Sequence, residues 1–437
     1  MKGSGNTFDW SESKVPNVSA GNESSPPLAF DAPLPASLLN IERKYRTNFL
    51  PWRGQFSPQL VETLLRAYAP ANAVVLDPFM GSGTVLVEAA RLACPVYGIE
   101  VNPAAYLLSR FYELCNIPHP EREEILLEAE SILADERPDA FELCLFSTGD
   151  IKVSLQKSKY AERYFEQNES LSRILIDVLK LLVDDKPTSE SYTAKWQAIR
   201  RAVLKLPYTK TTICAKLGDA RRVPLPDNSI DFVISSPPYI NVINYHHNFR
   251  TCVEALGWKP LVAAKSEIGS NRKFRQNRFL TVIQYCIDMS IAMTEICRVC
   301  KNSARILLIV GRESNIHKTP FYNSQILEHI ATKVVGLNIC LRQPRHFTNR
   351  FGKKIYEDIL HLSPVSSISP RQTKELINGA RELAKEVLLD ARNRVPADRA
   401  WYLHEAIRRV EAIEPSPFFD PQQARRKQDG FIPSSWR

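Results

Sequence analysis

The segment DPFMGSGT, from Asp77 to Thr84, limits the fold of this 437-residue chain more narrowly than any other feature. It follows the short β-branched run AVVL at 73–76 and opens the helical pattern TVLVEAARLA. Gly81 and Gly83 permit a tight turn from a strand into a helix, and they let a ligand approach the backbone closely. A buried strand that turns directly into a helix predicts the start of a parallel α/β sheet.

Further strand and helix patterns alternate along the chain. Residues 57–69 and 104–115 have the apolar spacing of helices. Runs typical of strands occur at 96–101, 214–219, 229–236, 304–310, 336–343 and 356–362. This alternation predicts a doubly wound, Rossmann-like α/β fold.

Composition and periodicity divide the chain into five regions. Residues 1–35 are rich in Ser, Asn, Gly and Pro, which predicts a flexible leader. Residues 117–212 contain three amphipathic helical patterns and predict a helical insert between two halves of the sheet domain, 36–116 and 213–364. Residues 365–437 predict a helical, basic C-terminal extension.

The charge balance favours an anionic partner. Lys and Arg outnumber Asp and Glu by 57 to 48, so nucleic acid is the first candidate. The sequence contains no run of about 18 apolar residues, so a membrane span is not expected. The N-terminus lacks the apolar core of a secretory signal. Nine scattered cysteines are typical of reduced intracellular thiols. Cys297 and Cys300 have the spacing of a metal-binding pair. No second CxxC and no histidine pair occur near them in the sequence, so no metal is expected.

Carboxylates end three of the expected strands. Asp77 would repel a phosphate, and no GK[ST] follows the glycine turn, so the ligand there should be cationic or neutral. Glu100, followed by Asn102, is placed to accept hydrogen bonds from two ribose hydroxyls. Asp219 could accept from an adenine amino group. Parallel strand ends share one edge of a sheet, which predicts a single ligand site, although helix capping or surface charge would also explain Glu100 and Asp219.

The expected strand 229–236 runs into Ser235, Ser236, Pro237, Pro238 and Tyr239. Two prolines end a strand and fix the backbone, so that the Ser236 hydroxyl and the Pro237 carbonyl project beyond it. Two acceptors beside an aromatic ring can hold a planar exocyclic amine and stack its ring on Tyr239. The alternative interpretation is a strand terminator with a packed tyrosine.

Together, DPFMGSGT and SPPY resemble the motif pair of the amino-methylating DNA methyltransferases that use S-adenosylmethionine, the cytosine-N4 and adenine-N6 family. The SPPY spelling is more typical of cytosine-N4 enzymes. The resemblance covers about residues 45–362 and includes the segment from Trp52 to Pro58. It implies a seven-stranded sheet in the order 3-2-1-4-5-7-6 with the seventh strand antiparallel. It also makes 36–116 the cofactor-binding half and 213–364 the catalytic half of a methyltransferase domain.

The same resemblance implies a site. The implied cofactor-binding residues are Phe56, Asp77, Pro78, Phe79, Gly81, Gly83, Thr84, Glu100, Asn102, Asp219 and Ser235. The implied catalytic residues are Ser236, Pro237, Pro238 and Tyr239. The target base of double-stranded DNA would be flipped into the pocket, and its amine would take the methyl group without a covalent enzyme intermediate. Carbon-5 methylation would need a cysteine nucleophile, which the SPPY loop lacks.

Two segments after SPPY are candidates for nucleic-acid binding. Asn244 and Tyr245 follow the loop closely, and a basic run surrounds Phe274. The cations of that run are Arg272, Lys273, Arg275 and Arg278. Such a run suits phosphate contacts, although a solvated basic loop has the same composition.

The expected setting is the prokaryotic cytoplasm, in association with the nucleoid. The enzyme would serve a restriction system with a cognate restriction endonuclease or act alone, and the sequence does not decide between the two. Three alternatives stay open: a DNA adenine-N6 methyltransferase, a tRNA guanine-N2 methyltransferase, and a nucleic-acid binder with an inactive methyltransferase fold. The RNA enzymes typically carry DPPY, and the inactive fold should have lost one of the two motifs. The sequence predicts neither the target site nor the role of the insert.

Overall fold

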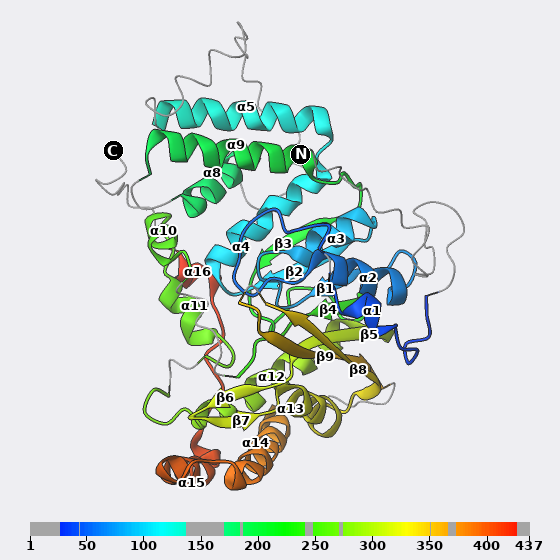
Figure 1. Cartoon of the computed structure of the whole chain (residues 1–437), viewed down its shortest axis with the longest axis vertical. Coiled ribbons are helices and arrows are strands. Elements are labelled where there is room, and N and C mark those ends of the chain that lie inside the picture. Colours follow the sequence, from blue (N-terminus) through cyan, green and yellow to red (C-terminus); the bar gives the residue numbers. More distant parts are fainter. Residues whose placement is uncertain are drawn as a thin grey trace, which may run out of the picture.

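A seven-stranded sheet forms the centre of the computed structural model, which describes residues 27–42, 44–136, 170–183, 187–240, 248–270, 274–349, 351–365 and 373–425 (Figure 1). The strands are β1 (Val75–Asp77), β2 (Val96–Glu100), β3 (Ile213–Leu217), β4 (Ile230–Ser235), β5 (Cys300–Gly311), β8 (Asn338–Thr348) and β9 (Lys354–Ser363). Their order is β3-β2-β1-β4-β5-β9-β8. The first five are parallel, and β9 runs antiparallel to both β5 and β8. The expected fold and strand order are confirmed.

Helices cover both faces of this sheet, as a parallel sheet requires. In β5, Leu307 and Ile309 belong to one apolar core, while Leu308 and Val310 belong to the other. The first core includes α2 (Pro58–Tyr68), α3 (Thr84–Arg91) and α4 (Pro103–Arg110). The second includes α12 (Leu280–Val299), α13 (Asn323–His329) and α14 (Thr373–Asp390).

The insert forms three helices, α5 (His119–Glu136), α8 (Leu171–Leu182) and α9 (Ser189–Lys205), at one end of the molecule (Figure 1). Arg122, which is fully buried, joins the start of α5 to the end of α9. Its guanidinium donates to the carbonyls of Ile117, Val203, Leu206 and Pro207. Four carbonyls therefore take up a buried charge that would otherwise lack partners. Residues 137–169 lie outside the described part of the chain.

Among the described helices, only α12 is long and apolar enough to cross a membrane. However, 78% of its apolar window is buried inside the fold, where it contacts α14. Its apolar character thus reflects its position as a core helix.

The expected flexible leader ends earlier than 35. Residues 27–35 are packed: Leu28 N donates to the Ala67 carbonyl at 2.9 Å, and Leu34 N donates to Gln343 Oε1 at 2.6 Å. The Phe30 ring lies 4.8 Å from the ring of His361. The expectation was wrong for these residues because prolines interrupt the spacing of their three large apolar side chains. Residues 1–26 lie outside the described ranges.

The C-terminal extension forms α14, α15 (Ala400–Arg408) and the short α16 (Pro421–Ala424). It returns to the sheet domain, where Arg425 pairs in a β-bridge with Trp258, between α10 (Arg250–Ala255) and α11 (Pro260–Ser266). A two-stranded hairpin of β6 (Ser314–Ile316) and β7 (Thr319–Phe321), absent from the sequence prediction, precedes α13.

Candidate active site

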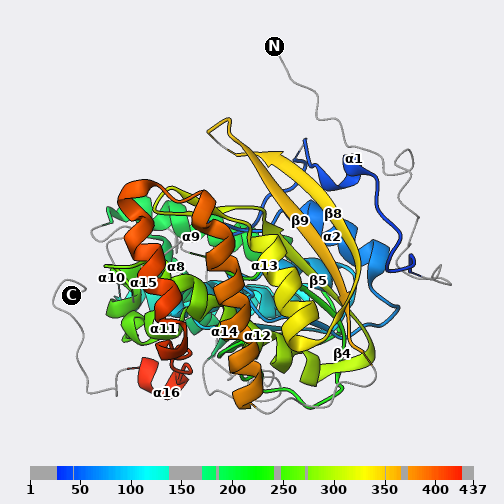
Figure 2. The ribbon, with the colours of Figure 1, turned by 90° about the horizontal axis from the view of Figure 1, so that it is seen from below.

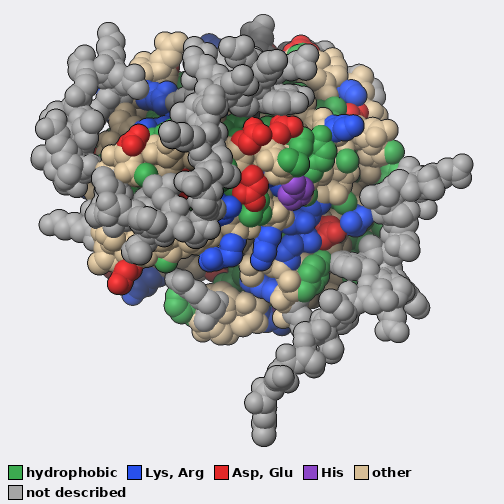
Figure 3. All heavy atoms as spheres, turned by 90° about the horizontal axis from the view of Figure 1, so that it is seen from above, with side chains coloured by type: hydrophobic (Ala, Val, Ile, Leu, Met, Phe, Trp, Pro, Cys, Tyr) green, Lys and Arg blue, Asp and Glu red, His purple; other side chains and the backbone are tan. Residues whose placement is uncertain are grey.

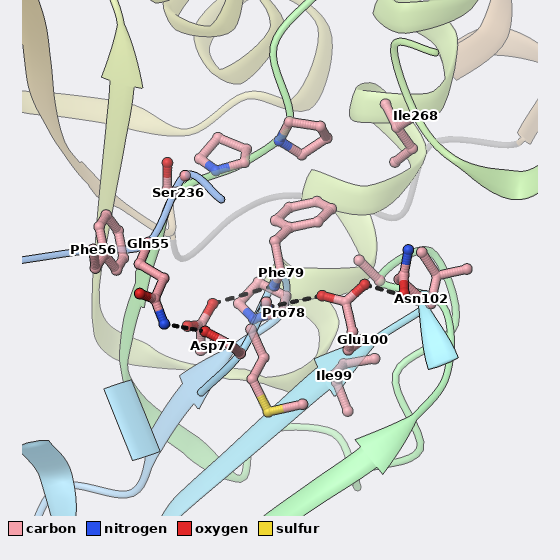
Figure 4. A pocket seen from close by; sticks show the side chains of 18 of the residues that line it. Gln55, Phe56, Asp77, Pro78, Phe79, Ile99, Glu100, Asn102, Ser236 and Ile268 are labelled. Atoms are coloured by element: carbon pink, nitrogen blue, oxygen red, sulfur yellow. Dashed lines mark hydrogen bonds between the residues drawn. The ribbon is translucent and has the colours of Figure 1, made fainter. Parts of the chain in front are cut away.

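A cavity of about 300 Å³ opens at the carboxyl ends of the central strands (Figure 4). Most residues proposed from the sequence line it: Phe56, Asp77, Pro78, Phe79, Gly81, Thr84, Glu100, Asn102, Asp219, Ser236, Pro237, Pro238 and Tyr239. Gly83 and Ser235 do not line it, although Ser235 donates a hydrogen bond to Asp77. The glycine turn and the SPPY loop, 158 residues apart between Asp77 and Ser235, are therefore neighbours in space. They meet because β1 and β4 are adjacent parallel strands.

The glycine turn is fixed at two positions. Gly83 has φ +87°, and a Cβ there would lie 2.8 Å from the Tyr112 ring, so any other residue would be both strained and obstructed. Gly81 has φ +55°, and its N–H donates to Glu100 Oε2 at 2.8 Å. Glu100 Oε1 accepts from Asn102 N at 2.8 Å. Glu100 thus holds the glycine turn to the end of β2.

Asp77 is almost fully buried at the end of β1. Ser235 Oγ donates to its Oδ1 at 2.5 Å, and Phe79 N donates at 3.2 Å. Burial raises the pKa of Asp77 to about 7, against the opposing effect of the Ser235 hydrogen bond. Burial also raises the pKa of Glu100 to about 7. Both carboxylates would gain from a positive charge in the cavity.

The lining is acidic. It includes the carboxylates of Asp77, Glu100, Asp219, Glu267 and Glu357, and none of the described lining residues is Lys, Arg or His. A phosphate ligand would find repulsion here, whereas a cation would find attraction. The cavity also offers apolar surface from Phe79, Met80, Ile99 and Ile268.

Asp219 differs from its expected role. Its Oδ1 accepts from Arg221 N (2.9 Å) and Nε (3.0 Å), and its Oδ2 accepts from Arg221 Nη2 (2.7 Å) and Phe419 N (3.0 Å). A carboxylate has about four acceptor positions, and protein donors fill all of them. The expectation of an adenine amino group on this carboxylate therefore disagrees with the geometry. Asp219 instead fastens the C-terminal extension to the cavity wall.

Arg221 is the centre of that attachment, and its side chain is fully buried. Its Nη1 donates to Asp288 Oδ1 at 2.9 Å and to the Ser416 carbonyl at 2.8 Å. Ser416 Oγ in turn donates to Asp288 Oδ2 at 2.6 Å. No local sequence pattern indicates this cluster, because its members are separated by up to 200 residues.

The SPPY loop is held from several sides. Tyr285 Oη donates to the Pro238 carbonyl at 3.1 Å. A Cβ at Gly269 would lie 2.7 Å from the Tyr239 carbonyl oxygen, and a Cβ at Gly311 would lie 2.8 Å from the Tyr239 ring. Ser236 Oγ lies 3.4 Å from Tyr239 Oη. In Figure 4, Ser236 and Ile268 lie across the cavity from Asp77 and Glu100.

Sequence reasoning missed the wall formed by β8 and β9. Glu357 lies on this wall, and Tyr239 Oη approaches its Oε1 at 3.5 Å. Burial raises the pKa of Glu357, while its ion pair with Arg345, 3.2 Å away, opposes the rise. Other lining residues that were not proposed are Trp52, Gly54, Gln55, Met80, Ser82, Ile99, Val101, Gly218, Ala220, Ser266, Glu267, Ile268, Phe347 and Ile355.

Most of the residues proposed to contact nucleic acid are not among those that the structure describes. Asn244, Tyr245, Arg272 and Lys273 lie outside the described residues. Arg275 is exposed and Arg278 is half-buried. Between these two, Asn277 Nδ2 donates to the Tyr402 carbonyl at 2.8 Å, which joins this segment to α15.

The N-terminal part of this chain matches a known protein family. Residues 7–110 match the family described as DNA methylase, N6_N4_Mtase. This match confirms, for that part of the chain, the resemblance to amino-methylating DNA methyltransferases. It includes DPFMGSGT and ends well before SPPY. The type II methyltransferase M.MjaII of Methanocaldococcus jannaschii is 39% identical over 86 residues, which are 19% of this chain and 15% of that protein.

Solved structures of methyltransferases align with much of this chain at low sequence identity. A SAM-dependent methyltransferase from Methanosarcina mazei aligns over 67% of this chain and 92% of its own, with 13% identity and a TM-score of 0.30. The rRNA methyltransferase aviRa from Streptomyces viridochromogenes aligns over 81% of this chain and 99% of its own, with 12% identity and a TM-score of 0.28.

The residues present fit S-adenosylmethionine. Its sulfonium and ammonium groups are cationic, which matches an acidic cavity, and its ribose hydroxyls match a lining that includes the Glu100 carboxylate as a hydrogen-bond acceptor. Asn102 Nδ2 is buried, has no hydrogen-bond partner among the residues that the structure describes and belongs to a lining residue, so it is available to donate to an acceptor of a bound ligand.

Proposed function

We propose that this protein is an S-adenosylmethionine-dependent DNA methyltransferase that methylates the exocyclic N4 amine of cytosine. The observation that carries the proposal is the single acidic cavity shared by the DPFMGSGT turn and the SPPY loop. The matched DNA methylase family supports DNA as the substrate. That family's name covers both N6 and N4 methylation, and the SPPY spelling is the reason to favour N4.

In this proposal, the cofactor half of the cavity binds the methyl donor. S-adenosylmethionine supplies an electrophilic methyl group when bound. Asp77 and Glu100 place negative charge at the floor of the cavity, and Phe56 and Phe79 supply apolar walls. The segment 50–56 closes this half, since Gln55 Nε2 donates to Ser82 Oγ at 2.8 Å and to the Leu50 carbonyl at 2.8 Å.

The SPPY loop would hold the flipped base. The Ser236 hydroxyl and the Pro237 carbonyl would each accept one hydrogen of the amine, and Tyr239 would stack on the ring. Two such hydrogen bonds draw the amine nitrogen out of conjugation with the ring, which leaves its lone pair free for direct attack on the methyl group. The transfer would form the bond between nitrogen and the methyl carbon while the bond from that carbon to sulfur breaks, and the proton of the methylated amine would pass to water. Because the amine itself attacks the methyl group, no cysteine nucleophile is needed.

The substrate class is tested by incubation with tritiated S-adenosylmethionine and, in separate reactions, unmodified genomic DNA or tRNA. We expect label in DNA alone. The Asp77→Asn variant provides the background. Label in tRNA alone would refute the DNA proposal and support the RNA alternative.

The name of M.MjaII, a type II methyltransferase, supports a restriction system with a cognate endonuclease as the setting.

Replacement of Tyr239 by Ala should lower kcat on DNA about 5- to 150-fold, because base–aromatic stacking contributes about 1–3 kcal/mol. The affinity for S-adenosylmethionine, measured by calorimetry, should change little. Tyr239→Phe is the matched control, since it keeps the ring and loses only the hydroxyl near Ser236 and Glu357. Equal losses of turnover and cofactor affinity in Tyr239→Ala would contradict the stacking role.

Cofactor affinity should depend on pH. Below their pKa of about 7, Asp77 and Glu100 are protonated and attract a cation less. Affinity should therefore rise with pH between 5.5 and 7, by up to about tenfold per unit for each proton released. Titration calorimetry in buffers of different ionisation enthalpy counts those protons. An affinity that is constant over this range would show that neither carboxylate ionises on binding.

A further inference from the structure

The β8–β9 hairpin projects away from the body of the molecule (Figure 2). Phe347 on β8 and Ile355 on β9 pair across it, and both line the cavity beside Tyr239. The tip, Phe351, is four residues beyond each of them. At about 3.3 Å per residue in a strand, the tip lies within about 13 Å of the cavity wall. One continuous element thus connects the cavity to the surface in front of it.

Hydrogen bonds join the described residues of the turn at the tip, 349 and 351–353. Asn349 Oδ1 accepts from Phe351 N at 2.9 Å and from Lys353 N at 3.0 Å, and Asn349 N donates to the Lys353 carbonyl at 2.9 Å. Gly352 has φ +75°. This turn presents Phe351 to solvent with 78% of its surface exposed, the highest value for a large hydrophobic residue in the described ranges. A single exposed hydrophobic side chain is ordinary, but this one is held outward beside a candidate active site.

The surroundings of the tip are cationic. No Asp or Glu occurs between Glu328 and Glu357 in the sequence. Lys353 and Lys354 are exposed, and within the described part of the chain neither forms an ion pair with a carboxylate. Lys354 Nζ lies 5.6 Å from the centre of the Tyr356 ring. Two cations without an ion-pair partner among the described residues, next to an apolar tip, match the phosphates that flank the base stack of a duplex.

A second basic surface is the alternative candidate for contact with DNA phosphates. Figure 3 shows Lys and Arg side chains gathered at the end of the molecule that carries the insert. On α9, the exposed cations are Lys195, Arg201 and Lys205. None of these three lines the cavity, whereas the hairpin does. The hairpin is therefore the better placed of the two to act on a base that enters the site.

We propose that the hairpin tip inserts into duplex DNA next to the target base, with Phe351 in the base stack and Lys353 and Lys354 on the adjacent phosphates. Apolar side chains inserted between base steps unstack them and kink the duplex. The tip would thereby lower the cost of moving the target base into the cavity. This inference rests on the proposed function, because it takes the cavity to be the site of a flipped base.

The wedge is tested by methyl transfer to genomic DNA and to the same DNA after heat denaturation. Phe351→Ala should lower kcat/KM on the duplex about tenfold or more, as loss of a base-stacking aromatic does. On single strands, whose bases need no unstacking, its kcat/KM should stay near that of the unmodified protein. Trp401→Ala is the matched control, since Trp401 is an exposed aromatic on α15 (67%) away from the cavity lining. An equal effect of Phe351→Ala on both substrates, or no effect, would overturn the wedge.

The phosphate contacts are tested by binding of a fluorescein-labelled, mixed-sequence duplex at several salt concentrations. Loss of two phosphate contacts in Lys353→Ala/Lys354→Ala should reduce the slope of log affinity against log salt by about 1.8. The control, Lys195→Ala/Lys205→Ala on α9, should leave the slope unchanged. A change in the control alone would overturn the hairpin assignment and place the DNA on the insert.

The methyl-transfer assay and the binding assay together distinguish a failure of this inference from a failure of the proposed function. If the unmodified protein transfers no methyl group to DNA but the hairpin lysines set the salt slope, the methylation proposal fails and the DNA surface stands. If every variant methylates and binds duplex DNA like the unmodified protein, the methylation proposal stands and the hairpin inference fails.

Discussion

Replacement of Asp77 by Asn should lower the affinity for S-adenosylmethionine about 10- to 150-fold. The variant keeps the shape of the side chain and an acceptor for Ser235 Oγ, but it removes the negative charge at the floor of the cavity. Hydrogen bonds to charged groups contribute about 1.5–3 kcal/mol, which sets the expected range. Titration calorimetry at pH 7.5 measures the affinity directly.

The same variant should be at least as stable as the unmodified protein without cofactor. Burial disfavours the charged form of Asp77, as its raised pKa indicates, so a neutral side chain removes that cost. Ser235→Ala is the control, since it removes the hydrogen bond and keeps the charge, and it should lose less affinity. Unchanged cofactor affinity in Asp77→Asn would exclude Asp77 from the binding site.

Replacement of Arg221 by Met should lower the free energy of unfolding by about 3–5 kcal/mol, because it leaves the buried carboxylates of Asp219 and Asp288 without their cation. The carbonyls of Ser416 and Pro417 would lose their donor as well. Urea denaturation measures the loss. Limited proteolysis should also show earlier cleavage around residues 416–425, because their attachment to the domain depends on Arg221.

The neighbouring residue provides a matched control. Arg222 is exposed, and, like Arg221, it packs over the Phe418 ring, at 4.8 Å from its centre. Arg222→Met should therefore cost less than about 1 kcal/mol, as exposed cation–π contacts do. Equal stabilities of the two variants would show that the buried cluster does not hold the extension.

Much of the fold could be predicted from the sequence because its signals are local. The strand that ends at Asp77 and the turn through Gly81 and Gly83 appear in the nine consecutive residues 75–83. Once parallel strands are expected, their carboxyl ends must share one edge, so Glu100 and Ser236 could be placed in the same cavity as Asp77. The structure brings these residues together as expected.

The parts of the site that could not be predicted depend on contacts between segments that are distant in the sequence. The side chain of Asp219 could not be assigned from its position after β3, because Phe419 N, 200 residues later, occupies one of its acceptor positions. Glu357 reaches the cavity through the antiparallel register that pairs it with Arg345. A register shift of one residue would turn both side chains to the opposite face of the sheet, and nothing local in the sequence fixes that register.

The identity of the methylated nucleoside is the most direct test of the proposed reaction. Genomic DNA methylated in vitro would be digested to nucleosides and analysed by mass spectrometry. We expect N4-methylcytosine, formed on the amine held by the SPPY loop. N6-methyladenine would retain the amine chemistry and move the target to adenine. 5-Methylcytosine would contradict methylation of an exocyclic amine, because carbon-5 transfer requires a nucleophile that the SPPY loop does not contain.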